Sequence, residues 1–238
     1  MIVSDLTLLV MVTTRGRRKQ VERLLDSYRE NTDAADVVFI MDPDDEDTYN
    51  GIDWGSALTS TLSPRGTNVE KLNRTAQAFW DDYDALMFVG NDHVFRTPHW
   101  DTIMLRKLES MGGTGMLYPD DKRRNDIPEI IMISSDIVKV MGQFAEASFS
   151  HYYIDNAWAE TGKRSGLLRY VPEVVIEHHH YSVDPETEYD ELYHYAEDWF
   201  GKSDLQAFHQ WRAAVMPHQI SLLRRKFNKD VSWVLKRF

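Results

Sequence analysis

The chain has 238 residues, 42% of them hydrophobic, and a formal net charge of −11. This length allows one domain with a substantial core, and the acidic balance excludes a protein that coats nucleic acid through a generally basic surface. Cysteine is absent, so disulfides and thiolate metal sites are excluded, and any metal ion would be held by oxygen and imidazole ligands.

Apolar runs and apolar residues at helical spacing alternate along the first part of the chain. The first run follows no basic segment and ends within a few residues at Thr13, so it predicts a strand and neither a signal peptide nor a membrane anchor. In chain order, the pattern predicts strands over 6–12, 37–41, 58–62 and 86–89, and helices over 21–28 and 69–80. Such alternation is typical of an α/β sheet with mostly parallel strands.

The same alternation continues in the second part, where residues 148–166 stand out as aromatic and polar, the composition of a binding wall. The predicted elements are a helix from Pro98 to 108, a short strand within 111–118, a strand over 130–133, a helix over 135–142 and a strand over 168–176. From Pro185 onward the periodicity is helical. We therefore expect a catalytic-type domain over 1–183 and a helical C-terminal extension over 184–238.

The C-terminal tail differs in charge from the body of the chain. Residues 212–238 hold seven basic side chains against one acidic one, a net +6 that leaves −17 on the remainder. Such a tail suits a phosphate-rich partner or a membrane face, or else a helix whose charges are solvated. The helical extension is also a candidate surface for oligomerisation.

Three predicted strands end at polar side chains with possible chemical roles. Open α/β sheets bind ligands at the carboxyl ends of their strands, so each end is a site candidate by position. The turn after the first strand, Thr13–Arg17, offers two guanidiniums for a diphosphate, or is a basic turn. It has neither P-loop nor GxGxxG spacing. Asp42 after the second strand can accept from a base or ribose, and Asn91–His93 after the central strand is a metal-competent triplet or a polar turn.

A histidine run ends the strand predicted over 168–176. Alternate strand residues point to one face, so His178 and His180 are expected to face the site together while His179 points away. Histidines in this position are either metal ligands or surface residues.

In this order and spacing, the motifs resemble the nucleotide-sugar glycosyltransferases of the GT-A fold, particularly the family 2-like enzymes frequent in bacteria and their phages. The resemblance covers about residues 6–181 and is carried by TTRGR, Asp42, KLNRTAQAFW, GNDH, RTPHWD, YYIDNAW and VIEHHHY. It implies a mixed, mostly parallel, Rossmann-like sheet flanked by helices. Because the first apolar run predicts neither a signal peptide nor a membrane anchor, we expect a cytoplasmic protein, in the host cytoplasm if a phage encodes it.

The resemblance implies a Mn²⁺ or Mg²⁺ ion that bridges the donor diphosphate, held by Asp92 and His93 together with His178 or His180. Asn91 stands where such enzymes usually have a first aspartate, and its amide supplies no charge. The implied contacts to the nucleotide sugar come from the strand ends and from the helix before the central strand, where Lys71 and Arg74 share a face and Asn73 lies off it. They are Thr13, Thr14, Arg15, Arg17, Asp42, Lys71, Asn73, Asn91 and Asp92.

By the same resemblance, Asp155 is the candidate catalytic base of an inverting enzyme, and Tyr153 and Trp158 line the sugar or acceptor. A helix N-cap is the competing role for Asp155, and Glu160 is the second candidate base.

The leading hypothesis is a metal-assisted transfer from a nucleotide-diphosphate sugar, with UDP as the expected nucleotide. The acceptor hydroxyl is left open between a protein, a glycan or lipid-linked saccharide, and a modified DNA base, which would have to be flipped out of a duplex. Two alternatives stand beside this hypothesis. One is a metal-dependent phosphoesterase that uses Asp42, Asp92, His178 and His180. The other is a degenerate, non-catalytic transferase-like domain that binds a partner through its C-terminal helices.

Overall fold

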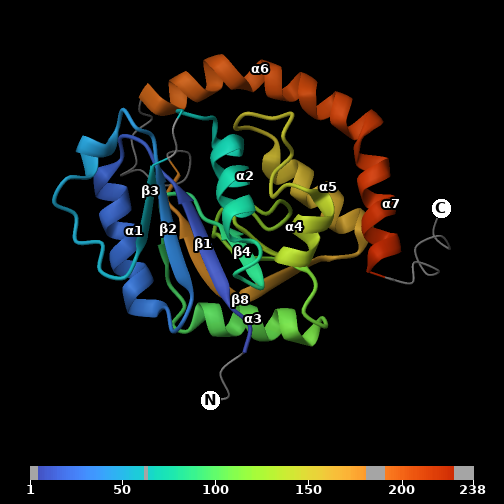
Figure 1. Ribbon diagram of the computed structural model, residues 1–238, viewed down its shortest axis with the longest axis horizontal. Coiled ribbons are helices and arrows are strands. Elements are labelled where there is room, and N and C mark those ends of the chain that lie inside the picture. Colours follow the sequence, from blue (N-terminus) through green and yellow to red (C-terminus); the bar gives the residue numbers. More distant parts are fainter. Residues whose placement is uncertain (1–4, 62–63, 181–190, 228–238) are drawn as a thin grey trace.

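The computed structural model describes residues 5–61, 64–180 and 191–227 (Figure 1). Its strands are β1 (Leu8–Thr13), β2 (Asp36–Met41), β3 (Leu58–Thr61), β4 (Ala85–Phe88), β5 (His93–Phe95), β6 (Met116–Asp120), β7 (Ile131–Ser134) and β8 (Leu168–His178). Its helices are α1 (Arg18–Asn31), α2 (Asn68–Phe79), α3 (Trp100–Ser110), α4 (Ser135–Met141), α5 (Ile154–Ser165), α6 (Glu191–Ala214) and α7 (Met216–Lys226), with a 3₁₀ turn η1 (Glu46–Tyr49). The predicted boundary between residues 183 and 184, and the last eleven residues of the basic tail, lie outside the described residues.

The strands form one mixed sheet in the order β3-β2-β1-β4-β7-β6-β8-β5. β1 pairs in parallel with β2 and β4, and β2 pairs in parallel with β3. β7 runs antiparallel to β4 and β6, β8 is parallel to β6, and β5 is antiparallel to β8. The predicted mixed, mostly parallel α/β sheet is confirmed, and its parallel half brings the carboxyl ends of β1, β2 and β4 to one edge.

Helices cover both faces of the sheet, because successive strand residues point to opposite sides. Leu9 and Met11 of β1 face a core shared with α2, α4, α5 and α7, whereas Val10 and Val12 face a second core shared with α1 and α3. α6 arches across one side of the molecule and α7 folds back against α4 and α5 (Figure 1). No helix within the described ranges is both long enough and apolar enough to cross a bilayer.

Two local expectations from the sequence need correction. Residues 93–95 form a strand that was not predicted, because three residues are too short to show a period. Helix α3 begins at Trp100 and not at Pro98, since His99 takes a left-handed φ of 60° at the N-cap position. The stretch expected to form a binding wall contains helix α5 from Ile154 onward.

Candidate functional site

A cavity of about 860 Å³ lies at the carboxyl ends of β1, β2 and β4. The N-terminal parts of α2 and α5, the end of β8 and one turn of α6 complete its wall. The residues predicted from the sequence that line it are Thr13, Thr14, Arg15, Arg17, Asp42, Lys71, Asn91, Asp92, His93, Tyr153, Asp155, Trp158, His178 and His180. Six segments far apart in the sequence therefore meet in one space.

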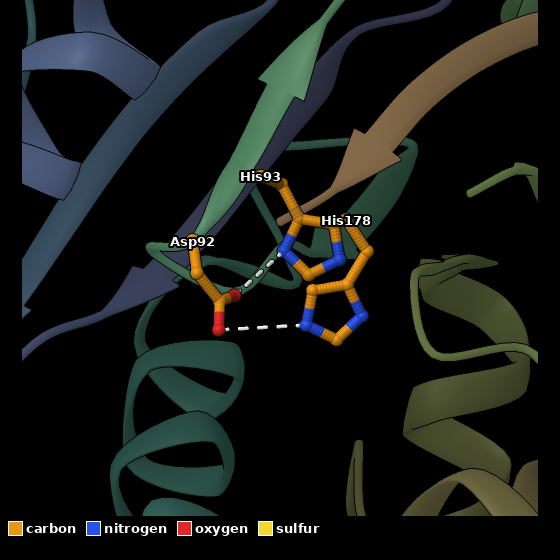
Figure 2. A group of neighbouring side chains, drawn as sticks. All are labelled: Asp92, His93 and His178. Atoms are coloured by element: carbon orange, nitrogen blue, oxygen red, sulfur yellow. Dashed lines mark ion pairs between the residues drawn. The ribbon is translucent and has the colours of Figure 1, made fainter. Parts of the chain in front are cut away.

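At one end of the cavity, Asp92, His93 and His178 converge (Figure 2). One Asp92 oxygen lies 3.1 Å from His93 Nδ1, and the other lies 3.4 Å from His178 Nε2. One potential ligand atom from each residue lies within 4.8 Å of the others. This spacing suits three donors around a single cation.

Strand pairing produces this convergence. In the antiparallel ladder of β5 and β8, His93 lies directly opposite His178, and the two imidazoles stack with ring centroids 4.1 Å apart. The backbone N–H of His179 donates to the carbonyl oxygen of Asp92 at 2.9 Å, which ties the end of β8 to the triplet after β4. The pairing of His178 with His93 therefore determines which histidine of the run enters the site.

The three side chains fit a divalent metal on the chemistry of their environment. His93 Nε2 is buried and has no hydrogen-bond partner among the described residues, and burial, together with the charge of His178, lowers the pKa of His93 and keeps its ring neutral. His178 Nδ1 lies 2.7 Å from Glu129 Oε2, which directs its Nε2 toward Asp92. Metal-ligating histidines commonly have such a carboxylate on the second ring nitrogen. A carboxylate with two imidazoles is a donor set that Mn²⁺ accepts.

The charges around Asp92 hold it ionised. Burial disfavours the carboxylate, but the neighbouring His178 and His93 outweigh burial and keep the pKa of Asp92 well below its ordinary value. Burial opposes the charged form of His178 as well, yet Asp92 and Glu129 raise its pKa to about 9. A divalent cation bound between Asp92 and His178 would take the place of the proton that His178 carries.

The other two histidines of the run differ from His178. His180 lines the cavity, with its ring centroid 5.2 Å from that of His178, but it is not part of the three-residue ligand cluster. His179 lies beside Glu177 and Arg96, away from the cluster.

A second group in the cavity wall is formed by ion pairs around Asp42, which is 1% exposed. Lys71 Nζ lies 2.8 Å and Arg15 Nη1 lies 3.1 Å from the Asp42 oxygens. Burial lowers the pKa of Lys71 while Asp42 opposes this shift. Asp42 lies outside the ligand cluster, so the structure does not assemble the four-residue set expected for a phosphoesterase.

Thr14, after β1, and Asn91, in the triplet after β4, also line the cavity. Asn91 Nδ2 donates to Thr14 Oγ1 at 3.0 Å, and Thr14 Oγ1 lies 2.8 Å from the hydroxyl of Tyr49. Arg17 Nη1 lies 3.5 Å from Asp92 Oδ2, so this guanidinium joins the first turn to the ligand cluster.

Two predicted site residues do not face the cavity. Asn73 donates to Ala145 O at 2.8 Å and accepts from the N–H groups of Phe144 and Ala145, so its amide fixes a loop. Glu160 extends from α5 to two guanidiniums, those of Arg164 and Arg212. Glu160 is therefore corrected as the second candidate base, because both of its oxygens are ion-paired outside the cavity.

Asp155 is the second residue of α5 and lines the cavity. Tyr153 takes the N-cap position, with a left-handed φ of 65°, so Asp155 is not the cap. One carboxylate oxygen accepts from the backbone N–H of Asn156 at 2.8 Å, and burial raises the pKa of Asp155 to about 6. Trp158, one turn further on, packs in the core and donates from Nε1 to Phe144 O.

Sequence reasoning missed several cavity residues, of which Glu129 matters most. Burial disfavours its charge, but the hydrogen bond from His178 and the guanidinium of Arg123 lower the pKa of Glu129 to about 2. Other missed residues include Arg65, Asn68, Glu70, His151 and Phe200. None of them follows a predicted strand directly, which was the pattern used to find the others.

No protein-family model and no curated protein sequence matches the chain, but its fold matches solved structures. The mannosyltransferase PcManGT from Pyrobaculum calidifontis, in complex with GDP-Man and Mn²⁺, superposes with a TM-score of 0.58 at 14% identity, over 92% of this chain and 73% of that chain. Glucosyl-3-phosphoglycerate synthase from Mycobacterium tuberculosis, with Mn²⁺, UDP-glucose and phosphoglyceric acid, gives 0.58 at 13% identity, over 85% and 80%. TarS from S. aureus gives 0.57 at 12% identity, and the chain covers 44% of its length.

The mixed sheet and these superpositions confirm the fold implied by the sequence motifs. At such low identities the likeness concerns the fold and not the substrates. This chain has the GT-A fold, in which two of the superposed proteins were solved with a nucleotide sugar and Mn²⁺.

Proposed function

We propose that the chain is a metal-assisted glycosyltransferase that uses a nucleotide-diphosphate sugar as donor. The observation that carries this proposal is the convergence of Asp92, His93 and His178 in the cavity at the carboxyl ends of β1, β2 and β4. That position is where an open α/β sheet binds its ligand.

In this proposal, one part of the cavity wall binds the diphosphate of the donor and another part binds its nucleoside. Asp92, His93 and His178 would hold a divalent cation, Mn²⁺ or Mg²⁺, which neutralises diphosphate oxygens when bound. Arg17, beside Asp92, and Lys71, beside Asp42, add positive charge along the same wall. Asp42 and the Thr14–Asn91 pair then face the nucleoside, for which we take UDP as the first choice.

Asp155 is the proposed base. Its carboxylate faces the cavity, and a pKa of about 6 leaves it ionised at neutral pH while keeping it basic enough to accept a proton. In the proposed step, the acceptor hydroxyl oxygen attacks the anomeric carbon as its proton moves to an Asp155 oxygen. The bond from that carbon to the diphosphate breaks, and a single displacement of this kind inverts the anomeric configuration.

A screen of nucleotides and nucleotide sugars tests the proposal. With Mn²⁺ present, one nucleotide sugar should raise the melting temperature of the protein and be hydrolysed slowly, and chelation of the metal should abolish both effects. Asp92→Ala should lose both, while Glu160→Gln, outside the cavity, should keep both.

Two outcomes would contradict the proposal. Metal-dependent cleavage of a simple phosphodiester such as bis(p-nitrophenyl) phosphate, with no response to any nucleotide sugar, would favour the phosphoesterase. The absence of any thermal response to nucleotides plus Mn²⁺ would favour the non-catalytic binding domain.

A further inference from the structure

One stripe of α6 faces the body of the molecule and changes character along its length. At its C-terminal end, Trp211 is buried against Phe149, and Phe208 stacks on Tyr153 with ring centroids 5.4 Å apart. One turn earlier the inward position is Asp204, and about one turn before that it is Gly201. The spacing of three to four residues places all four on one face.

Asp204 fixes α6 to the cavity wall. Its carboxylate is 2% exposed and accepts from three successive backbone N–H groups, those of Ser150, His151 and Tyr152, at 3.0, 2.8 and 2.9 Å. His151 and Tyr152 line the cavity and lead directly into α5 and Asp155. The distance between α6 and the candidate base is therefore set by a charged, buried contact.

Gly201 lies where this stripe reaches the cavity. Glycine weakens the interior of a helix relative to alanine, so its presence there needs a local reason. A Cβ atom at position 201 would meet no described atom within 4 Å, so close packing against the described residues is not the reason. Gly201 and its neighbour Phe200 both line the cavity, so the space beside Gly201 belongs to the cavity.

We propose that Phe200 and Gly201 of α6 form the far wall of an acceptor subsite for a carbohydrate, and that Gly201 sets the size of the sugar that fits. The proposal rests on the proposed transferase function. The subsite lies between this turn of α6 and Asp155, which both border the one cavity.

The lining of the subsite favours a sugar over the other acceptors. The rings of Tyr152 and Phe200 offer apolar surfaces to the C–H face of a pyranose, while Asp155 and Arg123 offer polar atoms to its hydroxyls. A DNA acceptor would have to bring its phosphates to a cavity that lies in residues 1–211, and the net charge of −17 on these residues disfavours its approach.

Single substitutions at position 201, with the adjacent exposed Lys202 as the matched control, test the proposal. The wild type, Gly201→Ala, Gly201→Trp and Lys202→Trp are compared in three assays. The first is the thermal shift with the donor and Mn²⁺, and the second is donor hydrolysis by water. The third is transfer to a panel of methyl glucosides, galactosides and mannosides and to maltose, cellobiose and lactose.

Gly201→Trp should keep the donor thermal shift and donor hydrolysis within threefold of the wild type, and should lose at least tenfold in transfer. Gly201→Ala should raise the melting temperature, because alanine favours the helix, and should reduce transfer to the disaccharides more than to the monosaccharides. Lys202→Trp should match the wild type in all three assays.

The remaining outcomes overturn the proposal in distinguishable ways. Unchanged transfer by Gly201→Trp, or loss of the donor thermal shift by this variant alone, means that this turn of α6 is not an acceptor wall. Donor hydrolysis by the wild type without transfer to any sugar, or with transfer to hydroxymethylated DNA instead, overturns the carbohydrate assignment and leaves the transferase function intact. A wild type that neither binds nor hydrolyses any nucleotide sugar overturns both proposals.

Discussion

Buried carboxylates in two regions of the molecule have opposite kinds of partners. Asp101 of α3, fully buried, accepts from the backbone N–H groups of Asp33, Ala34 and Ala35 at 2.7 to 3.2 Å. Asp92, in the cavity, is instead surrounded by titratable or flexible side chains, His93, His178 and Arg17. Backbone amides are fixed donors that no ligand replaces, whereas imidazoles can exchange a proton for a metal ion. The kind of partner that a buried carboxylate has therefore distinguishes a structural role, with backbone amides, from a functional role, with titratable side chains.

Asp204 belongs to both classes. It has the same partners as Asp101, three successive backbone amides, but the loop that it holds lines the cavity. If the comparison is sound, Asp204 and Asp101 should resemble each other in their effect on stability and differ in their effect on the site.

The largest expected effect is on turnover and comes from Asp92. Asp92→Ala removes the only carboxylate of the described ligand cluster, and we expect at least a ~10³-fold loss of donor turnover, equivalent to about 4 kcal/mol. Mn²⁺ should also cease to stabilise the protein in thermal-shift measurements. Turnover within tenfold of the wild type would mean that the cluster does not hold a catalytic metal.

The second effect compares the two amide-bound aspartates. Asp101→Ala and Asp204→Ala each leave buried N–H groups without an acceptor, so each should lower the free energy of unfolding by about 3 kcal/mol in urea titrations. At temperatures where both variants are folded, Asp101→Ala should keep wild-type kinetics and Asp204→Ala should lose transfer. Equal kinetic losses would remove the distinction between them.

The third effect is a pH-dependent gain in stability from Asp155→Asn. The folded chain binds the Asp155 proton more tightly than the unfolded chain, because burial raises the pKa from 3.8 to about 6. The stability due to this proton is present below pH 4 and is lost as the pH rises from about 4 to about 6. The asparagine variant should therefore exceed the wild type by about 3 kcal/mol at pH 8 and match it near pH 4.

The same Asp155→Asn variant should lose turnover at pH 8, where it is the more stable protein. Urea unfolding at several pH values, beside the donor assay, measures both quantities. A parallel loss of stability and activity at pH 8 would show that Asp155 stabilises the fold and is not held in an unfavourable charged state.

The smallest effect concerns Glu129. Glu129→Gln keeps the shape beside His178 but removes the charge that orients its ring, and we expect about tenfold weaker Mn²⁺ binding, about 1.4 kcal/mol. Calorimetric titration of the metal-free protein measures this directly. Unchanged affinity would mean that strand pairing alone positions His178.

The kind of contact that a site residue makes also explains whether it could be predicted from the sequence. Asp42, Asp92 and His178 were predictable as site residues because each follows an apolar run, and the carboxyl ends of neighbouring parallel strands meet. Glu129 and Asp204 act through partners 49 and 52 to 54 positions away, and nothing in their local pattern marks them. Strand β5 was missed for a related reason, since its three residues are defined by pairing with β8 and not by a period of their own.

The pairing of β5 with β8 also bears on how the chain folds. His93 and His178 lie 85 positions apart, and only three residue pairs hold their strands in register. A contact of such long range closes a large loop, so it is expected to form after β1 has paired with β2, whose partners such as Leu9 and Asp36 lie only 27 positions apart. If the metal site forms late, Mn²⁺ should slow the unfolding of the protein and leave its folding rate almost unchanged.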